Sequence, residues 1–221
     1  MNYRAEAIKA LKRAKHEMAS QDDSRVRYAA LELRMALEGL IYEVSKSYKE
    51  ELSDIDFNTW QPKEPLELVI EVDPTAYQSS EWWIGGQNEQ GQLPAAMTCL
   101  GVDRKLTLQQ IKKFYDRLGS YLHSPTIKQL TNNKAPDFTK LQNSCEELVH
   151  ILENVLTSEM FKTRMKVTSK IDCMACEAKI VRNIPHGVTE LTASCRKCGA
   201  CYTLKSKDAT VVWEPKLVPA P

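Results

Sequence analysis

The hydrophobic residues of the first 160 positions recur mostly at intervals of three and four, which is the spacing of amphipathic α-helices. Four stretches show this period, over about 3–19, 22–48, 108–122 and 136–158. Helices of this length with one wide apolar stripe must bury that stripe against partners. The pattern therefore predicts a helical bundle.

Residues 50–106 interrupt this period. Pro65 can open a short helix over 65–72, which ends before Asp73-Pro74. Residues 81–84 and 97–102 are rich in apolar and β-branched side chains and are separated by glycine-containing turn segments. We therefore expect a β-hairpin inserted into the bundle.

After a linker over 159–168, the pattern changes to short stretches with a period of two. Strands are predicted over 178–184, 188–192, 202–204 and 210–213, because these stretches are rich in β-branched residues and alternate with polar turns. The chain thus divides into a helical domain over 1–160, with its insertion at about 50–106, and a small all-β domain over 161–221.

Charge follows the same division. Residues 161–221 carry 11 Lys and Arg against 5 Asp and Glu, a balance of +6, although the whole chain has a net charge of only +1. A basic module favours an anionic partner. No stretch reaches the ~18 apolar residues of a membrane span, and the N-terminus lacks a secretory apolar segment, so we expect a cytoplasmic protein without membrane contact.

Cysteine spacing gives the clearest chemical signal. Cys173-x2-Cys176, then 18 residues, then Cys195-x2-Cys198 is the pattern of a structural zinc site with four thiolate ligands. A disulfide framework is disfavoured without a secretory signal, and a redox dithiol normally stands alone beside a βαβ unit. Cys201 leaves an alternative open, because Cys198-x2-Cys201 is itself a C-x2-C pair and the second ligand pair could shift.

These cysteines and short strands resemble a zinc ribbon over roughly residues 168–214. One zinc would then supply much of the free energy that folds so small a domain. Its cations are candidates for nucleic-acid contact through the phosphate backbone, with protein docking and a purely structural role as alternatives. The candidate residues are Lys179, Arg182, Arg196, Lys197, Lys205 and Lys207.

A second resemblance rests on Arg117-x5-His123 at the end of the predicted helix 108–122. This motif, together with the bundle, resembles the HEPN superfamily, whose members include ribonucleases of toxin and anti-phage systems. The resemblance implies that Arg117 and His123 are catalytic, in a site shared across a homodimer of the bundle. The residue after the arginine is Leu118, where nucleases of the family usually carry a polar side chain.

The chemistry of RNA cleavage suits these residue types. A histidine titrates near neutral pH as a general acid and base, and an arginine binds phosphate through two hydrogen bonds. Asp116 and Ser120 share the helix face of His123 and are expected to orient its imidazole, whereas Arg117 lies ~120° away around the axis. The alternative is structural: His123 caps the helix C-terminus and Arg117 pairs with a nearby acid.

The sequence as a whole predicts a mainly α fold with a small β-hairpin insertion and a small all-β zinc ribbon at the C-terminus. The expected function is that of a nucleic-acid-directed effector of a stress or anti-phage type, with RNA favoured over DNA and a metal-independent ribonuclease activity. The alternative is a non-enzymatic adaptor, whose bundle dimerises and whose ribbon recruits nucleic acid or a protein.

Overall fold

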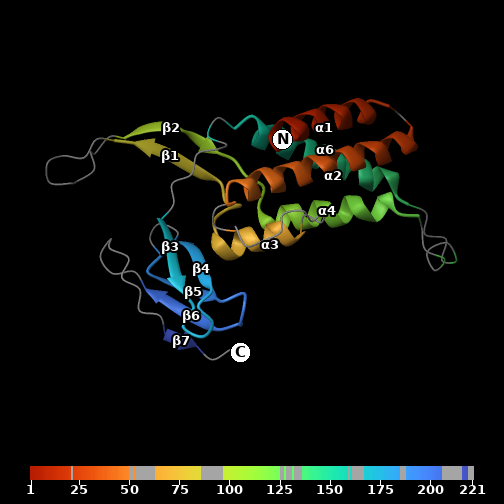
Figure 1. The fold of residues 1–221 in the computed structure, drawn as a ribbon. Helices are drawn as coiled ribbons and strands as arrows, with labels where there is room; N and C mark the ends of the chain where they lie inside the picture. The colour runs from red at the N-terminus through yellow and green to blue at the C-terminus, as the bar shows by residue number, and fades with distance from the viewer. Residues whose placement is uncertain are drawn as a thin grey trace. The chain divides into compact units, whose positions relative to one another are not determined.

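The computed structural model describes residues 1–20, 22–49, 52, 63–85, 97–124, 127, 131, 136–158, 160, 167–184, 188–205 and 216–218. The chain forms two compact units, each built from two separate segments (Figure 1). The first unit contains residues 1–44 and 77–163, and the second contains 45–76 and 164–221. The sequence placed 45–76 with the bundle, whereas the structure groups these residues with the ribbon.

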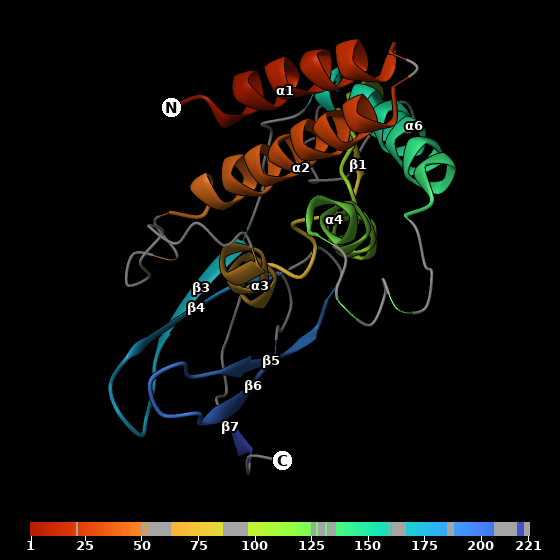
Figure 2. The ribbon, with the colours of Figure 1, turned by 90° about the vertical axis from the view of Figure 1, so that its right-hand side faces the viewer.

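The first unit is the predicted helical bundle. Its helices are α1 (Tyr3–Met18), α2 (Asp23–Lys46, whose last two residues belong to the second unit), α4 (Leu108–Leu122) and α6 (Phe138–Leu156). The four helices run side by side (Figures 1 and 2). The predicted stripes form the core, in which Leu33, Phe114, Leu118 and Leu148 are fully buried. Leu31 of α2 lies outside this core and is 44% exposed.

Capping side chains fix the start of α4 and of α6, and a glycine allows the close packing of α1 and α2. Thr107 and Gln110 form a capping box at the start of α4, so two backbone N–H groups are satisfied there. Gly39 lets α2 approach α1, since a Cβ at this position would lie 3.1 Å from the carbonyl oxygen of Tyr3. Asp137 caps α6 by accepting from the backbone of Lys140.

The expected β-hairpin is present in the first unit. Strands β1 (Ser80–Ile84) and β2 (Thr98–Asp103) pair antiparallel, with a bulge between Trp82 and Trp83. Trp83 is 50% exposed and Trp82 is partly buried, so the adjacent tryptophans have different environments as expected for neighbours in a strand.

The second unit combines α3 (Lys63–Val72) with the ribbon strands. Strands β3 (Val167–Asp172) and β4 (Lys179–Ile184) form one antiparallel pair. Strands β5 (Glu190–Ser194), β6 (Cys201–Lys205) and β7 (Lys216–Val218) form a three-stranded antiparallel sheet in that order. The strand predicted at 210–213 lies outside the described residues.

Candidate metal centre

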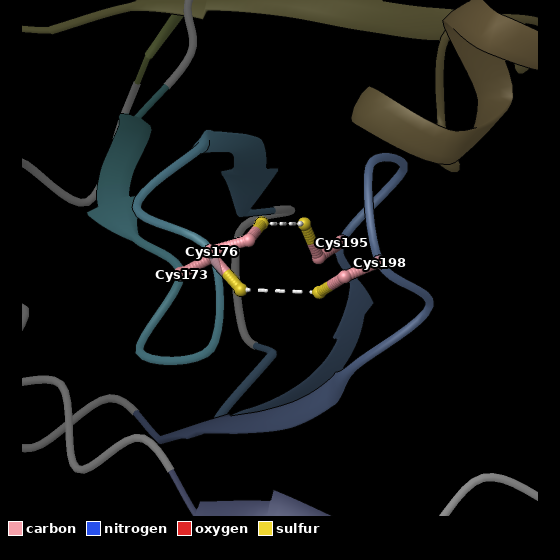
Figure 3. A group of neighbouring side chains, drawn as sticks. All are labelled: Cys173, Cys176, Cys195 and Cys198. Atoms are coloured by element: carbon pink, nitrogen blue, oxygen red, sulfur yellow. Dashed lines mark hydrogen bonds between the residues drawn. The ribbon is translucent and has the colours of Figure 1, made fainter.

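Four cysteines come together between the two pairs of ribbon strands (Figure 3). The Sγ atoms of Cys173, Cys176, Cys195 and Cys198 all lie within 4.8 Å of one another. Cys173 lies 3.5 Å from Cys198, and Cys176 lies 3.5 Å from Cys195. The four ligands predicted from their spacing are therefore confirmed as a group that could bind a metal ion.

These separations fit a tetrahedral ion with sulfur ligands. A metal–sulfur bond of about 2.3 Å places neighbouring sulfurs about 3.8 Å apart, between the shortest and longest separations of this group. A disulfide requires sulfurs about 2.05 Å apart, and all seven cysteines of the chain are free thiols. The disulfide alternative is thus wrong for this structure.

The two cysteine loops have the same backbone geometry. In the first, the N–H of Cys173 donates to the carbonyl of Ala178 at 2.9 Å, and that of Glu177 donates to the carbonyl of Cys173 at 2.8 Å. The same two bonds recur 22 residues later, at 2.8 Å each, around Cys195 and Gly199. The strands that flank each loop repeat with the same offset. The ribbon is therefore built from two equivalent halves, β3–β4 and β5–β6.

Cys201 does not belong to the sulfur group. It begins β6, where its Sγ lies 3.4 Å from the hydroxyl of Ser194 and 3.5 Å from the carbonyl oxygen of Gly199. The strand carries its thiol away from the turn that holds Cys195 and Cys198. The alternative in which the second ligand pair shifts to Cys198 and Cys201 is therefore not what the structure shows.

Tyr202 completes the surroundings of the sulfurs, and sequence analysis assigned it no part in the metal site. Its side chain is fully buried, and its hydroxyl lies 3.0 Å from the Sγ of Cys173. In the metal-free site, the hydrogen bond from Tyr202 lowers the pKa of Cys173 to about 6. The amide of Ala200 favours the thiolate of Cys198, but burial and hydrogen bonds to the other thiols raise the pKa of Cys198 to about 12.

Glu71 of α3 is a second residue that sequence reasoning missed. One of its carboxylate oxygens accepts from Arg182 of β4 at 2.6 Å, and the other accepts from Arg196 of the second loop at 2.8 Å. Arg182 also donates to the carbonyl of Ser194, and Arg196 donates to the carbonyl of Leu68. We call Glu71, Arg182 and Arg196 the arginine clasp. It holds α3 against the ribbon.

The clasp corrects two candidates for nucleic-acid contact. The side chain of Arg182 is only 5% exposed, so it cannot reach a phosphate without unfolding its surroundings. In the other half of the ribbon the equivalent position is Leu204, a core residue. Arg196 is 32% exposed, and its guanidinium is directed to α3. Both arginines therefore have a structural role.

The remaining basic candidates lie on the surface or outside the described residues. Lys179 pairs with Asp172 across β3 and β4, and Lys205 pairs with Glu190 across β5 and β6. Exposed pairs of this kind are weak and can exchange for phosphate. Lys197 is exposed and makes no ion pair with the described part of the chain. Lys207 lies outside the described residues.

Arg117 and His123 both lie at the exposed surface near the end of α4. Arg117 donates to the hydroxyl of Ser144 on α6 at 3.1 Å, whereas His123 is the C-terminal capping residue of α4. No hydrogen bond joins the two side chains among the described residues. Ser120, expected to orient His123, instead donates its proton to the carbonyl of Arg117 at 2.7 Å. Asp116 is exposed on the same helix.

Comparison of the chain with protein-family models, with curated proteins and with solved structures finds no match. Among the described residues, no helix combines the length and apolar character needed to cross a membrane.

Proposed function

We propose that the protein is a nucleic-acid-directed binding protein whose C-terminal unit folds around one zinc ion and contacts RNA. Zinc is favoured because four thiolates form the closed ligand shell of structural zinc sites. Free thiols throughout the chain suit the reducing cytoplasm, where we place the protein.

The proposed RNA surface rests on the different surroundings of the neighbouring residues Arg196 and Lys197. These neighbours occupy the two positions between the ligands Cys195 and Cys198, yet Arg196 binds Glu71 whereas Lys197 is exposed without an ion pair among the described residues. The turn between these two ligands thus presents to solvent a cation that no acid of the described residues neutralises. Lys170, Lys179 and Lys205 are also exposed on the flanking strands, and the ion pairs of Lys179 and Lys205 can exchange for phosphate.

Binding of a labelled single-stranded RNA, measured by fluorescence anisotropy over a range of salt concentrations, tests this surface. Lys197→Ala should lower the slope of log K against log salt by about 0.7, because one phosphate contact is lost. Arg196→Ala should leave this slope unchanged, since that side chain binds α3. Lys9→Ala on α1 is the control for a change of charge alone. A salt-independent affinity, or a Lys197→Ala variant that binds like the wild type, would favour protein docking and the adaptor alternative.

A second candidate function is metal-independent RNA cleavage by a HEPN-type site in the bundle. It is favoured by the exposure of both Arg117 and His123, because a side chain that acts on RNA must be accessible to it. His123 would exchange protons with the 2′-hydroxyl and the leaving oxygen, and Arg117 would stabilise the charged phosphorane. Since Arg117 is directed to Ser144, the proposal needs a homodimer in which the motifs of two chains face each other.

Incubation of RNA with the purified protein, without added metal, tests this candidate. Cleavage should leave 2′,3′-cyclic phosphate ends, because the 2′-hydroxyl is the nucleophile. His123→Ala should abolish it and Arg117→Lys should impair it, since a point charge does not replace a two-pronged donor. His16→Ala, at an exposed position of α1, should retain activity. A monomer in solution that leaves RNA intact would contradict the ribonuclease and support a stress or anti-phage adaptor.

A further inference from the structure

The hydroxyl of Tyr202 has a single arrangement of hydrogen bonds that satisfies its neighbours. The backbone N–H of Met174 donates to the Tyr202 oxygen at 3.0 Å, so this oxygen already serves as an acceptor. The Sγ of Cys173 lies 3.0 Å from the same oxygen. Because a metal-bound cysteine is a thiolate and has no proton, the hydroxyl proton must point to the sulfur.

We propose that Tyr202 is a positioning residue of the metal centre, which orients the Cys173 thiolate and withdraws charge from it by donating an O–H hydrogen bond. The inference rests on the proposed metal site. A side chain that hydrogen-bonds to a metal ligand fixes the orientation of that ligand and tunes its basicity, and its loss typically weakens metal binding. Burial strengthens this effect, since no water can replace the lost hydroxyl.

The equivalence of the two ribbon halves shows that this hydrogen bond is specific to one ligand. Tyr202 follows Cys195 by seven residues, and Ile180 follows Cys173 by the same number. Both side chains belong to the buried cluster around the sulfurs. The side chain of Ile180 has no hydrogen-bond donor, so Cys195 lacks the hydrogen bond that Cys173 receives from Tyr202. The thiolates of Cys173 and Cys195 are therefore chemically unequal, and Cys173 carries less negative charge than its counterpart Cys195.

Two consequences follow for a metal-loaded chain. A sulfur relieved of a hydrogen bond has higher-energy lone pairs, so removal of the hydroxyl shifts a sulfur-to-metal charge-transfer band to longer wavelength. The same sulfur becomes a better nucleophile, so Cys173 reacts faster with an alkylating agent. Tyr202→Phe removes only the hydroxyl and retains the buried ring, so the packing of the ribbon is preserved.

Titration of the full-length protein with Co²⁺ tests the proposal, since cobalt reports thiolate ligation by its absorption. Tyr202→Phe should move the charge-transfer band to longer wavelength and weaken Co²⁺ binding by about 10- to 100-fold. Mass spectrometry after iodoacetamide treatment should show faster alkylation of Cys173 relative to Cys195. The matched control is Tyr48→Phe, which removes from the same unit a buried hydroxyl that donates to the carboxylate of Asp73.

The outcomes separate this proposal from the metal site itself. Tyr48→Phe should bind Co²⁺ with the wild-type spectrum and affinity. If Tyr202→Phe also keeps both, Tyr202 is only a core residue and the positioning role is overturned while the metal site stands. If both variants change equally, the effect is one of general stability and the proposal fails. A wild-type chain that shows no thiolate-to-cobalt band would overturn the metal site, and the role of Tyr202 with it.

Discussion

Glu177 and Gly199 occupy equivalent positions directly after the two cysteine loops, and both have a left-handed backbone, with φ of 60° and 76°. Only glycine adopts this conformation without steric cost, because other residues bring Cβ close to the following carbonyl oxygen. The first loop thus accepts strain at Glu177 that the second loop avoids.

Exchange of these two residue types should change stability in opposite directions. Glu177→Gly should raise the free energy of unfolding of the C-terminal unit by about 1 kcal/mol, since it relieves the left-handed strain. Gly199→Ala should lower it by about 1 kcal/mol through the backbone alone, because a Cβ there meets no atom within 4 Å. Urea unfolding of the metal-loaded protein measures both. A change of the same sign in both variants would contradict the equivalence of the loops.

Metal analysis of the purified chain should find one zinc per molecule. Replacement of Cys173, Cys176, Cys195 or Cys198 with Ser should remove the metal and unfold the ribbon, because binding and folding of such a module are one process. The helical circular dichroism signal should largely remain, since the bundle has its own core. Cys201→Ser is the control and should retain zinc. Loss of zinc in that variant would show that Cys201 contributes a ligand.

The arginine clasp predicts a large effect from one conservative substitution. Glu71→Gln leaves Arg182 buried without a counter-ion, so we expect the free energy of unfolding of the C-terminal unit to fall by about 2–3 kcal/mol. This value is smaller than that of a fully buried ion pair, because the side chain of Glu71 is 34% exposed. Amide hydrogen exchange should then accelerate in α3 while zinc remains bound. Glu64→Gln, at an exposed position of the same helix, should change neither quantity appreciably. Unchanged protection of α3 in Glu71→Gln would contradict the clasp.

The helices and the metal ligands were predictable because their signals are local. A stripe such as that of α4 can be read from fifteen residues, and two C-x2-C pairs show four thiolates directly. The clasp was not predictable, since Glu71 and Arg182 are 111 residues apart and a lone acidic residue in a helix has no distinguishing pattern. The ribbon's charge pointed to nucleic acid for Arg182 and Arg196, because composition counts cations without showing which of them are internally paired.

The role of Tyr202 was predictable from the sequence only in part. The second loop repeats the C-x2-C-x-Ala pattern of the first after 22 residues, and this recurrence aligns Tyr202 with Ile180. The alignment marks Tyr202 as the polar member of an otherwise apolar pair. Which sulfur receives its proton still depends on the strand register, since β6 brings Tyr202 opposite Ala193 and its hydroxyl reaches across to the other loop.

Cys99 and Cys145, which both lie outside the metal centre, should differ in the rate at which their thiols react. Cys99 is exposed on β2, whereas Cys145 is fully buried in α6 and burial raises its pKa to about 12. In the folded protein at pH 8, Ellman's reagent should therefore modify Cys99 quickly and Cys145 only after unfolding. Cys99→Ser should remove the fast phase. Rapid labelling of Cys145 in the folded chain would contradict its burial.

The same shift gives a pH dependence. The folded state holds Cys145 neutral, and its pKa there lies above the unfolded value of about 8.5. The resulting stabilisation is complete below pH ~8.5 and is lost as the pH rises toward 12. Cys145→Ala should flatten the stability profile over this alkaline range, as measured by urea unfolding.

The arginine clasp also has a consequence for protein synthesis. Glu71 leaves the ribosome 111 residues before Arg182, an interval of roughly 5 to 20 s at ordinary elongation rates of about 5–20 residues per second. During this time α3 has none of its ribbon partners, while β1, β2, α4 and α6 are being made. The C-terminal unit can therefore close only after β4 and the second cysteine loop have left the ribosome. A fragment that begins at residue 161 would contain all four cysteines but would bury Arg182 with no carboxylate to receive it.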